Sequence, residues 1–335
     1  MKKTIISILA IIILSGGAFA AKILILDKPA DPQAFVNQAL ANSLTPNSGI
    51  SSVNVDIEAE DVFDTNGKIS FTLAGKFNKR QEYIPEIDYQ ISLAVNGDMM
   101  GEKGSIAASA NLIILDEVFY GKFKQLSLTE APPMIAAGLG AVNAFADKWY
   151  AFSLKNLKES DAEVQKFFEE QKQQQLAMRE SFKEFLKKNN VLIVESLAPS
   201  FGSTQEITAK LNIELLTSDK FFTEIEQFFD EQLSENLENP LSEMDEAKKN
   251  ETKETIRKIL GKINPQITLQ VGKKDNMLYG YDIVFDSNLA DLEIDDLNSG
   301  SVKITIKSNM SEIDQVQKIK APVEFEEIDP LKLMP

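Results

Sequence analysis

Cysteine and histidine are both absent from the 335 residues of this chain. Without cysteine there is no disulfide framework, no thiol nucleophile and no zinc thiolate site. Without histidine there is no imidazole base and no imidazole metal ligand, so serine-hydrolase triads and most zinc chemistry are excluded. Carboxylate-only catalysis and calcium bound by oxygen ligands remain open.

Positive charge is scarce, because 35 Lys and Arg stand against 51 Asp and Glu and give a net charge of -16. A phosphate backbone needs a basic face, so we expect no nucleic-acid partner. The composition, 43% hydrophobic and 26% charged, is that of a globular protein with a substantial core. Length alone is compatible with two domains or with one elaborated domain.

Residues 1–26 have the pattern of a signal peptide or an N-terminal membrane anchor. Two lysines precede an apolar run over residues 4–14, and an Ala-x-Ala triplet that ends at Ala20 follows it. The apolar run also resumes after Lys22, which gives a transmembrane helix long enough for a bilayer core of about 30 Å. We therefore expect an exported protein that is membrane-anchored and faces outside the cytoplasm, or is secreted or periplasmic if cleaved after Ala20.

Residues 68–115 show the clearest periodicity in the chain. Apolar side chains occupy alternate positions, among them Ile69, Phe71, Leu73, Tyr89, Ile91 and Leu93. A period of two predicts long antiparallel strands with one apolar face. The Asn-Gly pairs at 66–67 and 96–97 are hairpin signals and predict turns.

Helices and strands alternate less regularly in the rest of the chain. Asp31 as a cap and Pro32 at the first helical position predict a helix over residues 31–44. Further strands are expected over residues 52–59, 105–115, 117–128, 147–154, 191–201, 204–215, 266–274, 277–286 and 301–309. Further helices are expected over residues 160–189, 218–232 and 246–263, and residues 313–335 are expected to form an extended tail.

Two features have both a structural and a functional interpretation. The apolar segment 134–145 is either a loop that covers core or a mobile lid over an apolar site. The phenylalanines of the predicted helices are either core filler or the lining of an acyl cavity. Carboxylates in or near strands define no reaction, because nothing in the sequence fixes the separation of any pair; they are Glu117, Asp147, Glu195, Glu206 and Asp282.

Four local patterns resemble one known superfamily. They are the helix at 31–44 just after the export signal, the ribbon SFTLAGKF…YQISLAVNG, the strand EVFYGKF followed by DKWYAF, and the closing series ITLQVGKKDNMLYGYDIVF, VKITIKSN and KIKAP. The chain resembles the LolA/LolB-like superfamily of exported lipoprotein and lipid carriers, and more closely its LppX/LprG type. It departs in two respects: the lipobox cysteine is absent, so any anchor lies in residues 4–26, and the helical insertions are longer than expected.

The resemblance implies an α+β fold, a half-open antiparallel β-barrel of ten or eleven long strands with helices packed on its concave face. It implies a single domain over residues 27–312 with helical insertions near 160–189 and 218–263, and an extended tail over 313–335. It also implies a non-enzymatic protein of the cell envelope that binds or carries lipid or acyl chains between sheet and helices, without a cofactor or a metal.

The candidate cavity lining consists of apolar and aromatic residues of these strands and helices: Phe71, Leu73, Tyr89, Ile91, Leu93, Tyr120, Trp149, Phe152, Phe182, Phe221 and Phe228. The expected partners are a lipid or acylated ligand, the membrane through the N-terminal segment, and an envelope protein. The alternative is a structural or sensory envelope module, whose core is filled and which binds another protein.

Overall fold

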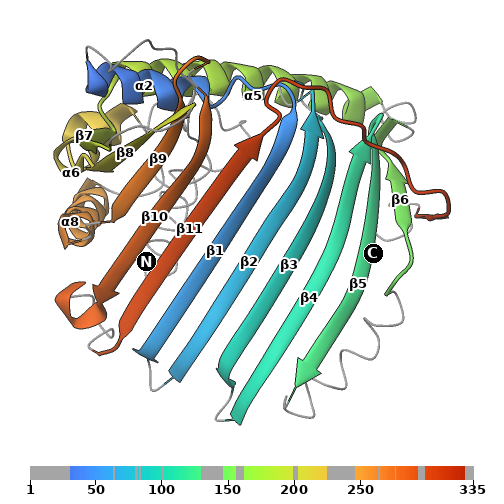
Figure 1. Cartoon of the computed structure of the whole chain (residues 1–335), viewed down its shortest axis with the longest axis horizontal. Helices are drawn as coiled ribbons and strands as arrows, with labels where there is room; N and C mark the ends of the chain where they lie inside the picture. The colour runs from blue at the N-terminus through green and yellow to red at the C-terminus, as the bar shows by residue number, and fades with distance from the viewer. Residues whose placement is uncertain are drawn as a thin grey trace. The chain divides into compact units, whose positions relative to one another are not determined.

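The protein has an α+β fold with a large, mostly antiparallel sheet that is not closed (Figure 1). The computed structural model describes residues 31–62, 65–79, 82, 84–99, 102–129, 146–155, 162–198, 203–224, 246–262, 265–275, 277–292 and 299–328. Ten of its strands have six residues or more, and two are shorter. The finer expectation of ten or eleven long strands in a half-open barrel stays a prediction.

The chain divides into two compact units. Unit 1 comprises Met1–Thr45 and Lys172–Asn298, and unit 2 comprises Pro46–Gln171 and Ser299–Pro335. Each unit is described by itself below. The single domain over residues 27–312 stays a prediction.

Unit 2 contains eight strands in the order β12-β6-β5-β4-β3-β2-β1-β11. Their bounds are β1 (Gly49–Val62), β2 (Thr65–Asn78), β3 (Glu86–Met99), β4 (Glu102–Leu115), β5 (Val118–Thr129), β6 (Tyr150–Ser153), β11 (Ser301–Ser311) and β12 (Glu326–Glu327). All neighbours pair antiparallel except β12 and β6. Figure 1 shows the long strands from β11 to β5 lying side by side.

The Asn-Gly pairs do not form the predicted turns. Gly67 lies within β2 and Gly97 within β3, where the two glycines face each other. A Cβ atom on Gly97 would lie 2.5 Å from the carbonyl oxygen of Asn66, and the φ of Gly97 is +154°. Glycine is therefore required here by the close approach of two strands, a use of the residue that a hairpin signal does not distinguish from a turn.

A C-terminal strap, residues 312–328, follows β11 and crosses the strand ends of the unit 2 sheet toward β6 (Figure 1). The backbone N–H of Asp314 donates to the carbonyl of Ser48 just before β1, at 2.9 Å. At the end of β2, Asn78 Nδ2 donates to the Gln317 carbonyl at 2.8 Å, and the Gln317 backbone N–H donates to Asn78 Oδ1 at 2.7 Å. Both residues are buried. The strap is thus tied to the sheet by fully satisfied buried polar groups.

The end of the strap packs against residues of β4, β5 and β6. Ile319 contacts a buried cluster of Ile113, Tyr120 and Ala151. The rings of Tyr120 and Phe325 meet edge to face at 5.3 Å. The two residues of β12 then pair with β6. The strap therefore adds both apolar and backbone contacts to the unit 2 sheet.

Unit 1 contains a four-stranded antiparallel sheet in the order β10-β9-β8-β7. Its elements are α2 (Pro32–Asn42), β7 (Leu192–Leu197), β8 (Thr204–Leu211), α6 (Ile213–Leu216), α8 (Glu246–Lys262), β9 (Gln266–Gly272), β10 (Leu278–Asn288) and the 3-10 helix η1 (Leu289–Leu292). The helix α5 (Ala162–Lys188) begins in unit 2 and continues into unit 1 from Lys172.

The predicted cap of the first described helix is confirmed. The Asp31 carboxylate accepts from the backbone N–H groups of Gln33 and Ala34, and Pro32 follows the cap. Gln33 also holds α2 against the sheet, because its amide donates to the carbonyl of Leu192 at 2.6 Å and accepts from the N–H of Val194 at 3.1 Å. The side chain thereby binds the edge of β7 as a neighbouring strand would.

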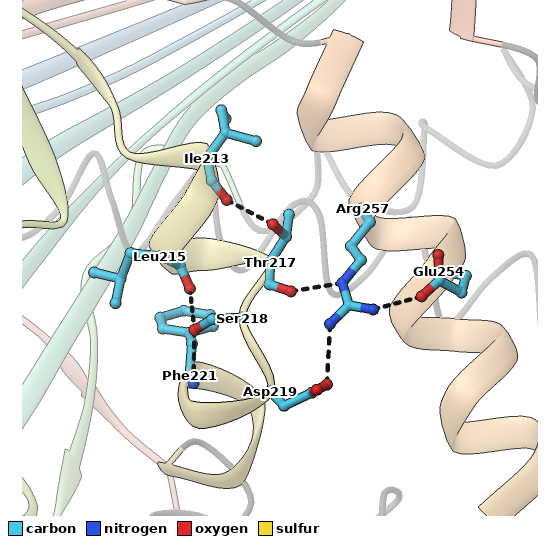
Figure 2. A network of polar contacts seen from close by, with 8 residues as sticks. All are labelled: Ile213, Leu215, Thr217, Ser218, Asp219, Phe221, Glu254 and Arg257. Carbon is cyan, nitrogen blue, oxygen red and sulfur yellow. Dashed lines mark hydrogen bonds and ion pairs between the residues drawn. The ribbon is translucent and has the colours of Figure 1, made fainter.

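Arg257 on α8 holds this helix against the turn that follows α6, as Figure 2 shows. Its Nε donates to the carbonyl of Thr217 at 2.6 Å, and its Nη2 donates to Asp219 at 3.0 Å. Ser218 accepts from the backbone N–H of Phe221, which orients the turn that carries this ring (Figure 2). Phe221 is then buried in the core of unit 1 with Leu216 and Ile259.

The expectation of a transmembrane helix is wrong for the part of the chain that the structure describes. None of the helices there is both long and apolar enough to cross a membrane. A span needs about 20 apolar residues. Only α5, with 27 residues, reaches this length, and charged side chains such as Glu169, Glu170 and Lys172 interrupt it. The segment 4–26, where the span is expected, lies outside the described residues.

We expect the substitution Asn78→Ala to loosen the strap. It leaves the buried N–H and carbonyl of Gln317 without partners, which should lower the free energy of unfolding by about 2 kcal/mol. Urea denaturation measures this loss, and trypsin cleavage after the exposed Lys318 and Lys320 should become faster. The matched control is Asn309→Ala at an exposed position of β11. Equal stability of the two variants would show that the strap contributes nothing through Asn78.

Tyr279 at the start of β10 should titrate at unusually high pH. Its hydroxyl donates to the Asp275 carboxylate, and this bond, with partial burial, raises its pKa to about 12. Because the folded state keeps a proton that the unfolded state loses above its ordinary pKa of about 10, stability is fully present below pH 10 and falls as the pH rises toward 12.

Ultraviolet difference titration of the chain against Tyr279→Phe isolates this phenol from the other tyrosines. In the unaltered chain the backbone N–H of Met277 donates to the Asp275 carboxylate at 3.1 Å. The substitution Asp275→Asn keeps an acceptor for this N–H but removes the negative charge. We expect the pKa of Tyr279 to fall toward its ordinary value in that variant. An unchanged titration in Asp275→Asn contradicts the assignment.

Candidate ligand-binding surface

The register of the unit 2 strands places apolar side chains on one face of the sheet. Four rows cross β11, β1, β2, β3 and β4, and together they define the apolar face. In strand order the rows are Met310, Ser51, Gly75, Tyr89 and Leu112; Ser308, Val53, Leu73, Ile91 and Ala110; Ile306, Val55, Phe71, Leu93 and Ala108; and Ile304, Ile57, Ile69, Val95 and Ile106.

This face is only partly covered. Ile306 is buried, but Ile69 is 41% exposed and Leu93 is 37% exposed. On the neighbouring strand β5, Phe123 faces Ala110 and is 57% exposed. The other positions of the face are half-buried. Large apolar side chains that stay open to solvent over several adjacent strands are typical of binding surfaces.

The opposite face of the same strands is polar and satisfied by its own cross-strand pairs. Thr72 donates to Asn54 at 2.9 Å, and Ser70 donates to Asp56 at 2.5 Å. Lys68 forms an ion pair with Glu58 at 2.6 Å, which lowers the pKa of that carboxyl through the hydrogen bond to the ammonium group. The sheet is therefore amphipathic: one face is polar and suited to contact with water, and the other is suited to contact with apolar groups.

Tyr89 lies flat over β2 because residue 75 is glycine. A Cβ atom at residue 75 would lie 2.0 Å from the carbonyl oxygen of Asp88 and 2.5 Å from Cδ1 of Tyr89. The ring can therefore cross the strand, and its hydroxyl reaches Ser51 on β1 at 3.0 Å. Ser51, Gly75 and Tyr89 form one row of the register, so three strands share this contact.

The structure brings five of the predicted site residues together. Phe71 faces Leu93 and Leu73 faces Ile91 across β2 and β3, and Tyr89 lies in the next row. All five belong to the apolar face, and Leu93 is the most exposed of them. The alternation of the strands thus predicts a contiguous group of side chains.

The remaining predicted site residues lie elsewhere. Tyr120 belongs to the buried cluster that the strap covers, with Trp149 packed against it. Phe152 stacks on Phe119 with ring centroids 5.6 Å apart. Phe228 lies outside the described residues, as does the segment 134–145.

The two predicted site residues of unit 1 belong to a stack of phenylalanines. The ring of Phe182 lies 6.2 Å from Phe185, which lies 6.0 Å from Phe221. Phe221 is 7% exposed and packs with Leu216. Phe221 is therefore part of a core against which Phe185 packs, whereas Phe182 is half-buried.

A shallow pocket of about 190 Å³ lies in unit 1 beside β7 and the start of α6. Its lining includes Ile193, Lys210, Asn212 and Pro265. Ligand pockets usually measure about 300 to 1,000 Å³, so this one is too small to enclose an acyl chain. It is also polar at one side, because Lys210 forms an ion pair with Glu195 at 2.9 Å.

Acidic residues form no metal site in the described part of the chain. There, no three Asp or Glu side chains gather closely enough to hold a metal ion. Asp147, considered above as a possible catalytic carboxylate, lies at the surface 3.7 Å from Lys122. Glu195 is likewise half-exposed and paired with Lys210. These carboxylates have the surroundings of surface ion pairs.

Two residues of the Tyr89 contact, Ser51 and Gly75, are not predicted from the sequence. Ser51 is the hydrogen-bond partner of Tyr89, and Gly75 leaves room for the Tyr89 ring; this is the only hydroxyl pair among the described positions of the apolar face. A glycine within an otherwise alternating strand, with an aromatic residue on the next strand, is a signal for such a contact. The signal becomes specific only when the register places Gly75 directly opposite Tyr89.

No family model matches the chain, and no curated protein matches its sequence.

The substitution Gly75→Ala should displace the Tyr89 ring and destabilise the sheet. The new methyl group would overlap backbone as well as the ring, so we expect a loss of about 2 kcal/mol in the free energy of unfolding. Gly121→Ala is the matched control, because a Cβ atom there meets nothing within 4 Å. Denaturant unfolding of both variants tests this, and equal stabilities would contradict the packing of Tyr89 on Gly75.

Proposed function

We propose that this protein is a non-enzymatic, exported protein of the cell envelope that binds an acyl chain of a lipid or acylated protein on the apolar face of unit 2. The observation that supports this most is the continuity of that face, with Ile69 and Leu93 open to solvent between half-buried neighbours. A ligand that covers these side chains would gain about 0.8 kcal/mol for each methylene group removed from water.

The dimensions of the face are suitable for such a ligand. The strands β1 to β4 have 14 residues each, which corresponds to about 45 Å of extended chain. The hydrocarbon core of a bilayer, about 30 Å thick, contains two opposed acyl chains, so one chain is about 15 Å long. A single acyl chain therefore fits along one strand or across several of them.

The resemblance to the LolA/LolB-like superfamily supports the same function. We propose on this basis that the sheet forms a half-open barrel with helices on its concave face, and that the ligand is carried there. Export depends on residues 1–26, which lie outside the described part of the chain. The protein would then act outside the cytoplasm, where its ligands are envelope lipids or acylated proteins.

A second candidate is a structural or sensory envelope module that binds another protein. It is favoured by the filled core of unit 1, where Phe221 and Ile259 are buried together. The acidic composition, with a net charge of -16, would then direct the choice of partner. The two candidates differ in what covers Leu93: an acyl chain in the first, and protein in the second.

Leu93→Glu should weaken the binding of a fluorescent acyl probe while the protein stays folded. A carboxylate in the middle of the apolar face would have to lose its hydration under the ligand, so we expect at least about tenfold weaker binding. Because Leu93 is 37% exposed, the unliganded fold should tolerate the change. Gln90→Glu is the control, since it adds the same charge on the opposite, exposed face of the same strand.

Mass spectrometry of organic extracts from the purified chain should also identify bound lipid. If the extracts contain no lipid and the acyl probe does not bind the unaltered chain, the carrier function is wrong. In that case, recovery of a crosslinked envelope protein would favour the second candidate.

A further inference from the structure

The apolar face contains a small polar site. Among its described positions, three side chains carry a polar group, Ser51, Ser308 and Tyr89, and all three are hydroxyls. Ser51 and Tyr89 share a hydrogen bond of 3.0 Å, and Ser308 lies in the adjacent row on β11. The hydroxyls therefore gather toward one end of a face that is otherwise hydrocarbon.

The Ser51–Tyr89 pair has hydrogen-bonding capacity left over. Each hydroxyl has one proton and two acceptor lone pairs, and the bond between them uses one proton and one lone pair. One O–H group thus remains able to donate to a ligand. The pair is half-buried rather than sealed, so a ligand on the face can reach it.

The same positions provide no positive charge. None of the described residues of the apolar face is a lysine or an arginine. The lysines of β2, Lys68 and Lys76, alternate with the residues of the apolar face and so lie on the opposite face, where Lys68 pairs with Glu58. An ionised carboxylate or phosphate laid on the apolar face would lose hydration without a counter-charge, whereas an ester carbonyl needs only one donor.

We propose that the Ser51–Tyr89 hydroxyl pair receives the ester carbonyl of an uncharged acyl ester, whose chain lies along Leu73, Ile91 and Leu93. This rests on the proposed function and narrows its ligand class from acyl compounds in general to acyl esters, as opposed to free fatty acids. The chain and the hydroxyl pair are adjacent because Tyr89 and Ile91 are successive residues on this side of β3.

The pair is already positioned for this role. Gly75 allows the Tyr89 ring to lie flat, and the bond to Ser51 fixes the position of the phenolic oxygen. A donor that is held before the ligand arrives loses little conformational freedom on binding. The structural alternative is that the pair only ties β1 to β3 across β2, in which case its removal changes stability but not the choice of ligand.

Calorimetric titration of the full chain with three probes of matched length separates these roles: methyl decanoate, decanoate and the corresponding alkane. We expect the ester to bind about fivefold more tightly than the alkane, the gain of one hydrogen bond, and more tightly than decanoate. The double variant Ser51→Ala/Tyr89→Phe removes both hydroxyls and keeps the ring, so it should lower the affinity for the ester to that for the alkane.

Thr72→Val is the matched control, because it removes a cross-strand hydrogen bond of the same kind, to Asn54, on the polar face. It should preserve the preference. Equal ester preference in the double variant and in the unaltered chain, or decanoate binding as tight as that of its ester, would overturn the assignment of the hydroxyl pair while the carrier function stands. Failure of all three probes to bind the unaltered chain would overturn both.

Discussion

The antiparallel register of the unit 2 strands is the constraint on which its surface chemistry depends. Successive side chains of a strand point to opposite faces, so a shift of one residue would exchange the two faces completely. The long ladders between β1 and β2 and between β2 and β3 fix this register over most of each strand. The apolar face is therefore a property of the pairing, and no single residue creates it.

An apolar face that stays half-exposed contributes less to stability than a filled core, so other contacts must hold these strands. The cross-strand pairs of the polar face do so, as do the buried bonds between Asn78 and Gln317. The strap also covers Tyr120 at one edge and leaves Leu93 open. The region around Tyr120 is thus stabilised by burial under the strap, whereas the strands around Leu93 are held by hydrogen bonds on their polar face.

Periodicity in the sequence predicts much of this, and its failures have physical causes. Alternation predicts the strands and the shared face of Phe71, Leu73 and Leu93, and cap chemistry predicts the start of α2 at Asp31. The predicted cavity lining mixes two units, because an aromatic residue has the same signature in a core as at a binding surface. Phe221 illustrates this, since its place in a core depends on Arg257 and its contacts far along the chain.

Gly75 and Tyr89 show why the site itself needs the structure. Neither residue alone indicates a site: a glycine usually weakens a strand, and a tyrosine side chain in a strand usually packs against its neighbours. Once the register sets them opposite each other, the glycine explains the flat ring, and the flat ring explains why its hydroxyl reaches Ser51. A hydroxyl pair on an apolar face either only links the strands β1 and β3 or also donates a hydrogen bond to a ligand. Removing both hydroxyls while keeping the Tyr89 ring distinguishes the two, because only the second role alters the choice between ester and alkane.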